Sequence, residues 1–469
     1  MKIAFIHYHL KPGGVTTVLK HQCDALREFG KSLLLCGEAP REHWQDEVSV
    51  IPGIAYDSIR TDSHSPKDIS ASILDSIYAK WPDGCDLIHI HNPTLAKNKS
   101  FLKVVDHLQK SKIPLLLQVH DFAEDGRPNA YFSEPYPKNC HWCVINQRDY
   151  GALIRAGGNK EGIHYLPNAV VVNQASADTR QLNDCILYPI RAIRRKNIGE
   201  AFLLSLFVNN DLPVRITLPP NSPVDKLSYS SWQQFASRHH LNIEFEAGLL
   251  HDFPSLMNSS KWILSCSIME GFGFSFLESW QFGKAVWGRY LEGICTGFEQ
   301  AGIAFPNFYR SIDVPLNWIG EQEFFESWHK TIIDVYEAYN IQPDQESIQS
   351  AAGTIKDQGT IDFGLLNEHF QKKVLTGIIN DKFALGVLAE QNPSLIYASE
   401  TDAKKPLIES NARIIANEFN LKNYSALLKK TYQHVINTTV RQEIKKSALL
   451  TGFLNPQAFS LLKWGKYVE

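Results

Sequence analysis

The chain alternates short apolar runs with segments whose apolar residues recur at helical spacing. Its first third contains five such runs: KIAFIH, SLLLC, DLIHIH, IPLLLQVH and HWCVI. Runs of this kind are typical of strands buried on both faces of a parallel sheet. After the first run, Val18, Leu19 and Leu26 lie at helical spacing, and Gly30 is the expected C-terminal cap of that helix. The alternation predicts a doubly wound α/β domain over residues 1–172.

The same alternation restarts after a polar stretch, VVNQASADTRQLND, which is typical of an interdomain linker. CILYPI, VRITL, IEFEA, KWILSC and AVWG are the predicted strands of a second α/β domain over residues 183–310. Two such domains in sequence predict a cleft, with ligands outside the carboxyl ends of the strands. Residues 311–469 show helical patterns without intervening strands. We expect a helical insertion there, followed by C-terminal helices of which the last packs back toward the first domain.

Composition narrows the class of protein. The formal charge of −3 lacks the basic bias of a nucleic-acid binder. The N-terminus lacks the features of a secretory signal, and no apolar run reaches the roughly 20 residues that span a bilayer. Eight scattered cysteines are typical of reduced thiols, and Cys140 and Cys143 are expected to be packed thiols, since no second ligand pair follows them. We expect a soluble cytoplasmic protein.

The stretch EGFGFSFLESW carries two glutamates, Glu270 and Glu278, at a predicted strand-to-helix turn. The helix is expected to begin near Phe274, and unpaired N–H groups at a helix start favour an anion. Glycines let the main chain approach that anion closely. Glu278 could accept hydrogen bonds from ribose hydroxyls, and Glu270 could reach the reacting group. The alternative is a structural turn followed by a glutamate that favours the helix dipole.

A second predicted strand-to-helix turn that could carry chemistry contains a basic cluster, IRAIRRKN. Arg191 and Lys196 stand at the strand end and the helix start, where they could stabilise a departing diphosphate. Arg194 and Arg195 are expected to belong to a solvated face. The chain has no Asp-x-Asp pair, which often holds Mg²⁺ or Mn²⁺ on a nucleotide diphosphate. Neutralisation by side chains and a helix N-terminus, with no metal, is therefore favoured.

Two stretches of the first domain are further candidates. In KPGGVTTV, Gly13 and Gly14 could turn backbone amides toward a phosphate or a sugar, although the dinucleotide fingerprint is absent. In LLLQVHDF, His120 ends a predicted strand, so its side chain is expected to face the cleft, whereas a lone histidine there is often structural. His89 and His91 are expected to be structural, because no carboxylate partner is evident.

These four stretches, in this order, resemble the retaining GT-B glycosyltransferases of family 4. The Glu-x7-Glu element, the Arg-x4-Lys element, the twin glycines, the QVHD strand end and LPNAV carry the resemblance. It covers roughly residues 1–290 and touches 410–436. Three departures stand out: Ile190 and Ala169 occupy positions where the family has glycine, and RYLEGICTGFEQAG replaces its usual glycine-pair segment. The stretch from about 310 to 400 looks like an insertion that could shape the acceptor pocket or a homo-oligomer contact.

The resemblance implies a fold and roles for particular residues. It implies two Rossmann-like domains facing across a cleft, with the acceptor on the N-terminal side and the donor on the second. Glu278 would bind the ribose, and Glu270 the transferred sugar and the distal phosphate. The catalytic residues would be His120, Glu270, Arg191 and Lys196, and the donor-binding residues Gly13, Gly14, Phe272, Gly273, Phe274 and Glu278. His120 would contact the sugar near its C6 hydroxyl.

The expected activity follows from the resemblance. A hexose would pass from a nucleoside-diphosphate sugar, of the UDP-glucose or GDP-mannose type, to a hydroxyl acceptor: a small polar molecule, a glycan or a lipid. No cofactor or metal is expected, and no enzyme nucleophile, since catalysis would rest on charge stabilisation and positioning. Two alternatives stay open: a phosphorylase-like enzyme of the same fold, and a catalytically silent GT-B protein that binds a sugar or a partner.

Overall fold

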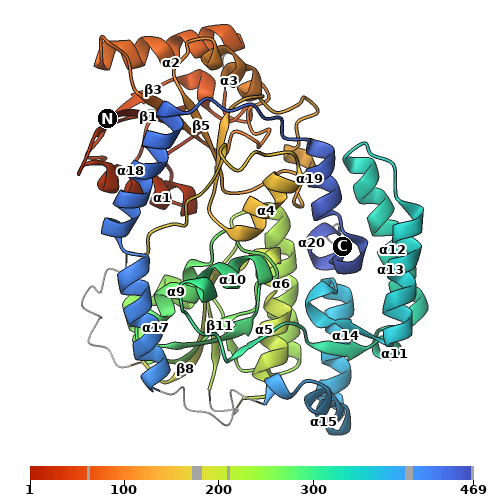
Figure 1. Cartoon of the computed structure of the whole chain (residues 1–469). Coiled ribbons are helices and arrows are strands. Elements are labelled where there is room, and N and C mark those ends of the chain that lie inside the picture. The colour runs from red at the N-terminus through yellow and green to blue at the C-terminus, as the bar shows by residue number, and fades with distance from the viewer. Residues whose placement is uncertain (61–63, 172–181, 209–211, 397–404, 466–469) are drawn as a thin grey trace. The chain divides into compact units, whose positions relative to one another are not determined.

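The computed structural model describes residues 1–60, 64–171, 182–208, 212–396 and 405–465 of the 469-residue chain (Figure 1). The chain divides into two compact units. The first unit comprises residues 1–171 and 417–454, and the second unit comprises residues 172–416 and 455–469. In the part of the chain that the structure describes, no helix combines the length and the apolar character needed to cross a membrane.

The first unit is built on a parallel sheet of the order β3-β2-β1-β4-β5-β6-β7. Its strands are β1 (Lys2–His7), β2 (Lys31–Cys36), β3 (Glu47–Val50), β4 (Leu87–His91), β5 (Leu115–Val119), β6 (His141–Val144) and β7 (Ile163–Tyr165). β1 pairs with β2 on one side and with β4 on the other, so the strand order reverses there. The carboxyl ends of strands at such a reversal are where doubly wound proteins bind ligands.

Helices cover both faces of this sheet. They are α1 (Gly14–Leu26), α2 (Pro66–Lys80), α3 (Phe101–Gln109), α4 (Gln147–Arg155), α18 (Leu421–Asn437) and α19 (Lys446–Phe453). α2 and α3 pack together on one apolar cluster, and α1 and α18 on a second one. Gly30 does not cap α1: that helix ends at Leu26, and a Cβ on Gly30 would lie 2.6 Å from the Met1 carbonyl oxygen. The close approach of the Met1 main chain, rather than helix capping, explains why residue 30 is glycine.

The second unit repeats the parallel arrangement in the order β10-β9-β8-β11-β12-β13. Its strands are β8 (Cys185–Arg191), β9 (Val214–Leu218), β10 (Ile243–Glu244), β11 (Ser260–Ser265), β12 (Ala285–Arg289) and β13 (Phe308–Tyr309). Its helices before residue 310 are α5 (Ile198–Ser205), α6 (Pro223–Arg238), α7 (Ala247–Leu250), α8 (Phe253–Ser259), α9 (Phe274–Gln281) and α10 (Glu292–Gln300). The order reverses between β8 and β11. The predicted pair of doubly wound α/β domains is confirmed.

The last third of the chain differs from the expected helical region. Two short strands, β14 (Asp313–Pro315) and β15 (Thr360–Asp362), pair antiparallel where none was expected. The helices are α11 (Leu316–Ile319), α12 (Glu321–Ala338), α13 (Gln345–Gln358), α14 (Glu368–Asn380), α15 (Lys382–Gln391), α17 (Lys405–Glu418) and α20 (Leu461–Trp464). Most of this region packs within the second unit, while residues 417–454 pack within the first. Local spacing cannot reveal β14 and β15, because three-residue strands become strands only by pairing.

Candidate active site

The second unit carries the predicted charged residues at the point where its strand order reverses. After β8 the chain forms a 3-10 turn, η3 (Arg194–Lys196), and then enters α5. After β11 it forms a loop that contains Glu270 and then enters α9 at Phe274, as expected. Because β8 and β11 are neighbours, the two loops lie at the same edge of the sheet.

Lys196 and Glu270 form a buried ion pair at this edge. The Lys196 ammonium donates to Oε1 of Glu270, and the two side chains are 15% and 10% exposed. Burial raises the pKa of the Glu270 carboxyl, but the charges of Lys196 and Arg195 and a hydrogen bond from Ser267 outweigh burial, so its pKa lies below the ordinary value. The Tyr188 hydroxyl donates to the Lys196 carbonyl and lies 3.4 Å from the Ser267 hydroxyl. The surroundings therefore favour the ionised form of the Glu270 carboxyl.

The start of α9 presents main chain rather than side chains. Gly273 is the N-cap, with φ +88°, and no side chain caps the helix. A Cβ at Gly273 would lie 2.9 Å from Phe276 Cδ2, so both conformation and space require glycine. The Phe272 ring packs against those of Phe274 and Phe298. This turn can therefore offer its backbone N–H groups to a ligand, and such an arrangement favours a phosphate.

Glu278 lies one turn into α9. Its side chain is partly buried, and it makes no ion pair or side-chain hydrogen bond with the residues that the structure describes. Burial raises the pKa of its carboxyl above the ordinary value. A partly buried carboxylate with no protein partner is available to accept hydrogen bonds from a ligand.

Arg191 ends β8, as expected, whereas Arg194 and Arg195 differ from the expectation. Arg191 is exposed, and its guanidinium donates to the Pro219 carbonyl at 2.9 Å and to Asn221 Oδ1 at 2.6 Å, so it is not paired with Glu270. Arg194 and Arg195 do not form a solvated face. Both are partly buried. Arg194 Nη1 donates to the Gly465 carbonyl, its backbone N–H donates to Asp225 at 3.1 Å, and Arg195 is close enough to lower the pKa of Glu270.

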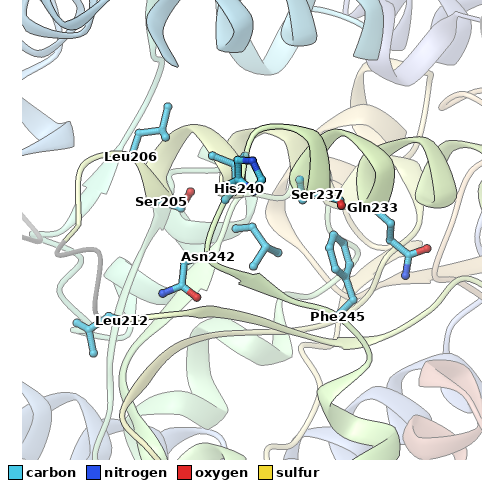
Figure 2. Close-up of a pocket in the computed structure, with 11 residues that line it drawn as sticks. Ser205, Leu206, Leu212, Gln233, Ser237, His240, Asn242 and Phe245 are labelled. Carbon is cyan, nitrogen blue, oxygen red and sulfur yellow. The ribbon is translucent and has the colours of Figure 1, made fainter. Parts of the chain in front are cut away.

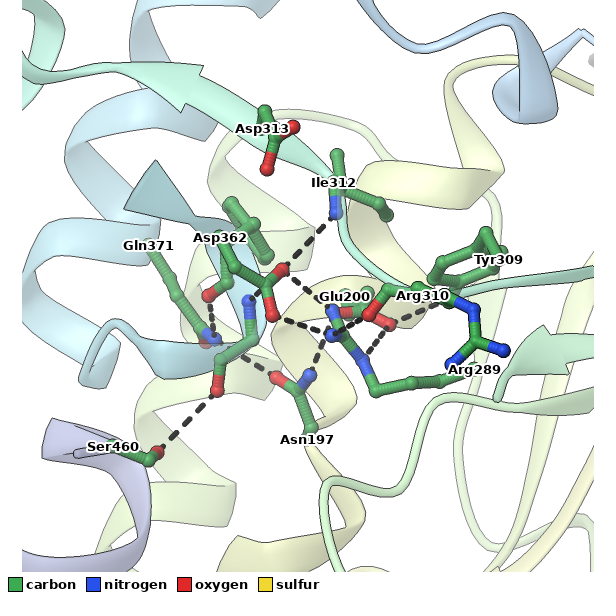
Figure 3. Close-up of polar contacts among 12 residues, drawn as sticks. Asn197, Glu200, Arg289, Tyr309, Arg310, Ile312, Asp313, Asp362, Gln371 and Ser460 are labelled. Carbon is green, nitrogen blue, oxygen red and sulfur yellow. Dashed lines mark hydrogen bonds and ion pairs between the residues drawn. The ribbon is translucent and has the colours of Figure 1, made fainter. Parts of the chain in front are cut away.

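A buried polar network begins at Asn197, immediately after Lys196 in the chain (Figure 3). Asn197, the next residue, has φ +51° and donates from Nδ2 to Glu200 Oε2 at 2.9 Å. Glu200 is fully buried, and it also accepts from Arg289 Nε at 3.1 Å and from the Tyr309 hydroxyl at 2.6 Å. Arg289 Nη1 in turn donates to Asp362 Oδ2 at 2.6 Å. The network links the turn that carries Lys196 to β12 and β15. A charged Glu200 within the apolar IGEAFLL was the one signal of it in the sequence.

The first unit carries His120 at the end of β5. The imidazole is 6% exposed, and its Nε2 lies 2.9 Å from His91 Nδ1. The His120 backbone N–H donates to Asn92 Oδ1 at 2.7 Å, which fixes the strand end. Burial lowers the pKa of His120 to about 4, so the imidazole is neutral at pH 7. Sequence reasoning assigned His91 a structural part and missed its bond to His120.

Gly13 and Gly14 lie at the start of α1, after β1. Gly13 is extended, with φ 168°, and no side chain caps the helix. A Cβ on Gly14 would meet nothing within 4 Å, and one on Gly13 only the Lys11 carbonyl oxygen at 3.9 Å. Packing does not require glycine at either position, which leaves room for a ligand beside the main chain.

Two features lie apart from these residues. Cys140 and Cys143 are buried, unpaired thiols at and beside β6, and no group of three or more potential metal ligands occurs among the described residues. A hollow of about 720 Å³ is lined by the ends of α5 and α6 and the starts of β9 and β10 (Figure 2). It therefore lies at the amino edge of the second sheet, opposite the edge that carries Lys196. Its one titratable described lining residue is His240.

Comparison with known proteins identifies the fold. No protein-family model matches the chain. The chain is 31% identical over 318 residues to the mannosylglucosyl-3-phosphoglycerate synthase of Petrotoga mobilis (strain DSM 10674 / SJ95). The match covers 58% of this chain, which spans 62% of the length of that relative.

Solved structures extend the comparison over most of the chain. The HepE protein of Anabaena, in complex with UDP and glucose, matches with a TM-score of 0.54 and 14% identity, over 92% of this chain and 99% of that one. A glycosyltransferase from Rickettsia africae ESF-5 matches with a TM-score of 0.55 and 11% identity, over 93% and 99%. These likenesses show that the chain has the two Rossmann-like domains of the GT-B fold.

Proposed function

We propose that the chain is a retaining glycosyltransferase of family 4 that moves a hexose from a nucleoside-diphosphate sugar to a hydroxyl acceptor without a metal. The observation that carries the proposal is the buried Lys196–Glu270 pair beside the uncapped start of α9, where the second sheet reverses its order. Side-chain cations, backbone N–H groups and a helix N-terminus are the groups that stabilise a diphosphate.

Each residue takes a role that fits its surroundings. As the bond between the anomeric carbon and the diphosphate oxygen breaks, Lys196 and the N–H groups at Gly273 and Phe274 stabilise the negative charge on the phosphate. Glu270 holds Lys196 and contacts the hexose, and Glu278 accepts hydrogen bonds from the ribose. Arg195, which already acts on Glu270, supplies positive charge that the family motif assigns to Arg191.

Bond making completes the reaction on the same face of the sugar. The acceptor oxygen bonds to the anomeric carbon on the side from which the diphosphate departs, and its proton passes to a phosphate oxygen. The configuration is therefore retained, and no enzyme nucleophile takes part. His120, which is neutral at pH 7, is proposed to contact the hexose near its C6 hydroxyl as a hydrogen-bonding group.

The relative from Petrotoga mobilis favours one acceptor class. Its name describes the synthesis of a sugar-bearing 3-phosphoglycerate. Among a small polar molecule, a glycan and a lipid, we therefore place the small, phosphorylated polar molecule first. The donor is proposed to carry glucose or mannose on UDP or GDP, since UDP and glucose occupy the HepE structure and the relative's name contains both sugars.

Ligand-induced stabilisation tests the proposal directly. UDP, GDP, ADP, UDP-glucose and GDP-mannose are each added to the full chain, and the melting temperature is measured. A true ligand at 100 times its dissociation constant adds about 2.7 kcal/mol to the free energy of unfolding. A shift with one base and its sugar supports the proposal, and no shift with any of them favours a silent protein. Release of a sugar phosphate that requires added phosphate would identify a phosphorylase.

The absence of a metal requirement has its own test. Donor turnover is compared with and without EDTA, and then with manganese restored. Unchanged turnover supports neutralisation by Lys196 and the helix start. Activity that is abolished by EDTA and recovered with manganese would overturn that part of the proposal.

A further inference from the structure

Buried imidazoles form a layer on one face of the first sheet. His89 and His91 alternate on β4, so both side chains point to the same face. Their rings stack with centroids 4.6 Å apart, and the rings of His91 and His120 are nearly parallel, with centroids 5.2 Å apart. At its far end, His89 Nδ1 lies 2.9 Å from the hydroxyl of Tyr432 on α18. The layer thus runs from a helix that covers the sheet to the strand end that carries His120.

The nitrogens of this layer differ in their hydrogen bonding. His91 Nδ1 and His120 Nε2 share one hydrogen bond of 2.9 Å. His91 Nε2 is enclosed, with no hydrogen-bond partner among the described residues. The other nitrogen of His120, Nδ1, has no hydrogen bond to a described residue either, but it is not one of the enclosed atoms. His120 Nδ1 is therefore the nitrogen of the pair that a ligand can reach.

The enclosed nitrogen decides which ring donates in the shared bond. Both rings are neutral, so each carries one proton. If His120 Nε2 donated, His91 would carry its proton on Nε2, as a buried N–H with no acceptor. If His91 Nδ1 donates, Nε2 is a bare lone pair instead. Buried N–H groups without a partner are rarer than under-satisfied acceptors, because the lost hydrogen bond to water is not replaced. The shared proton belongs on His91 Nδ1.

We propose that His91 is a positioning residue that fixes His120 as the tautomer protonated on Nδ1, so that His120 presents an N–H donor to an oxygen of the ligand. Under the proposed function, on which this role rests, that oxygen belongs to the transferred hexose. A nitrogen that already carries a proton cannot take up the proton of the acceptor hydroxyl. His120 therefore holds the sugar, and the departing phosphate takes that proton. The titratable groups that act on the pair are His7, whose ring centroid lies 6.2 Å from that of His91, His89 and Asp121.

Histidine-labelled protein tests the tautomer without any turnover. Two-bond ¹H–¹⁵N correlation spectra distinguish a protonated Nδ1 from a protonated Nε2, and the His120→Gln variant identifies the His120 signals. We expect a protonated Nδ1 in the wild type, and a changed ¹⁵N shift of the bare Nε2 in His91→Phe, which keeps a ring but loses the donor to that nitrogen. A protonated Nε2 in the wild type, or an unchanged Nε2 shift in His91→Phe, would overturn the proposal. Neither result depends on whether the chain is a glycosyltransferase.

Kinetics then test the consequence, once a donor is known. His91→Phe should lower kcat/KM about tenfold, the loss of one aligned hydrogen bond. His91→Asn, whose amide can place a donor near the former Nδ1, should recover most of it. His89→Phe makes the same ring substitution two residues earlier on β4, at a side chain that does not contact His120. It should leave kcat/KM within about twofold of the wild-type value. Equal losses in His89→Phe and His91→Phe, or no recovery in His91→Asn, would mean that stacking rather than the hydrogen bond matters.

Discussion

The Lys196 ammonium donates to Glu270 Oε1 across the reversal point of the second sheet, although neither loop is near the other in sequence. Both side chains are largely buried, and the lysine's charge favours the ionised carboxylate. A buried pair of this kind adds little net stability, because desolvation offsets attraction. The pair is better explained as holding the Lys196 side chain in place until a more negatively charged ligand binds.

Removing the lysine should therefore affect the chemical step. Lys196→Ala is expected to lower kcat by roughly 10²–10³-fold, the usual effect of losing one group that stabilises developing charge, with a smaller change in donor KM. Steady-state kinetics with the identified donor measure both constants. Lys261→Ala is the matched control, since this exposed lysine on β11 pairs with Asp184 at 3.1 Å. Wild-type turnover by Lys196→Ala would refute the electrostatic assignment.

Glu278 should affect binding instead. Glu278→Gln is expected to raise the dissociation constant of the nucleoside diphosphate roughly 10–100-fold, the effect of losing hydrogen bonds to a charged group, with kcat nearly unchanged. The same variant should raise the free energy of unfolding of the free protein at pH 7. Burial raises the pKa of the Glu278 carboxyl, so its ionised form destabilises the native state. Calorimetry and urea unfolding report the two effects, and a variant that is both less stable and fully competent in binding would contradict this role.

The sequence predicts the parts of this fold that depend on local pattern. Buried parallel strands appear as apolar runs, and Lys196, Glu270 and His120 follow such runs, so their place at strand ends could be predicted. The bond between His91 and His120 could not, because it depends on the register of two strands. Arg195 was misjudged for a similar reason: a basic run does not reveal which of its members turns toward a carboxylate.

Substitutions at two glycines should distinguish a glycine that folding requires from one that leaves room for a ligand. Gly273→Ala should lower the free energy of unfolding by about 1–3 kcal/mol, because its φ is +88° and the new Cβ would lie 2.9 Å from Phe276. Gly14→Ala places its Cβ in open space in the first turn of α1 and should leave stability unchanged or raise it by up to about 1 kcal/mol. If Gly14 admits a ligand, the same variant should weaken binding of the nucleotide sugar. Urea unfolding and calorimetry measure the two quantities, and a Gly14→Ala variant that binds as the wild type does would remove Gly14 from the site.

The buried polar network around Arg289 should contribute strongly to the free energy of unfolding. Arg289→Met leaves Glu200 and Asp362 without their shared cation, and we expect a loss of about 3–5 kcal/mol in the free energy of unfolding. Arg310→Met is the matched control, because Arg310 pairs with Glu292 at an exposed position, where solvent screening leaves such pairs with little effect on stability. Urea unfolding of both variants measures the two losses in the free energy of unfolding. Equal losses would show that the buried network is no more important than a surface pair.

The imidazole layer of the first unit should make the fold sensitive to mild acid. Burial lowers the pKa of His7 and His89 to about 3 and that of His120 to about 4, below the value of about 6.5 in an unfolded chain. Between these values the unfolded chain binds protons that the native protein does not. Stability is therefore fully present above about pH 6.5 and falls as the pH drops toward 4, by about 2 kcal/mol at pH 5 for a single such imidazole.

Urea unfolding at pH 7, 6 and 5 measures this dependence. His7→Phe, which removes one of these groups, should flatten the slope by at most one proton's worth, an upper limit of about 1.4 kcal/mol per pH unit. His329→Phe, at an exposed position on α12, should leave the slope as it is in the wild type. A wild-type free energy of unfolding that stays constant from pH 7 to pH 5 would mean that these rings take up protons in the native state. His120 could then no longer be treated as a neutral donor over that range.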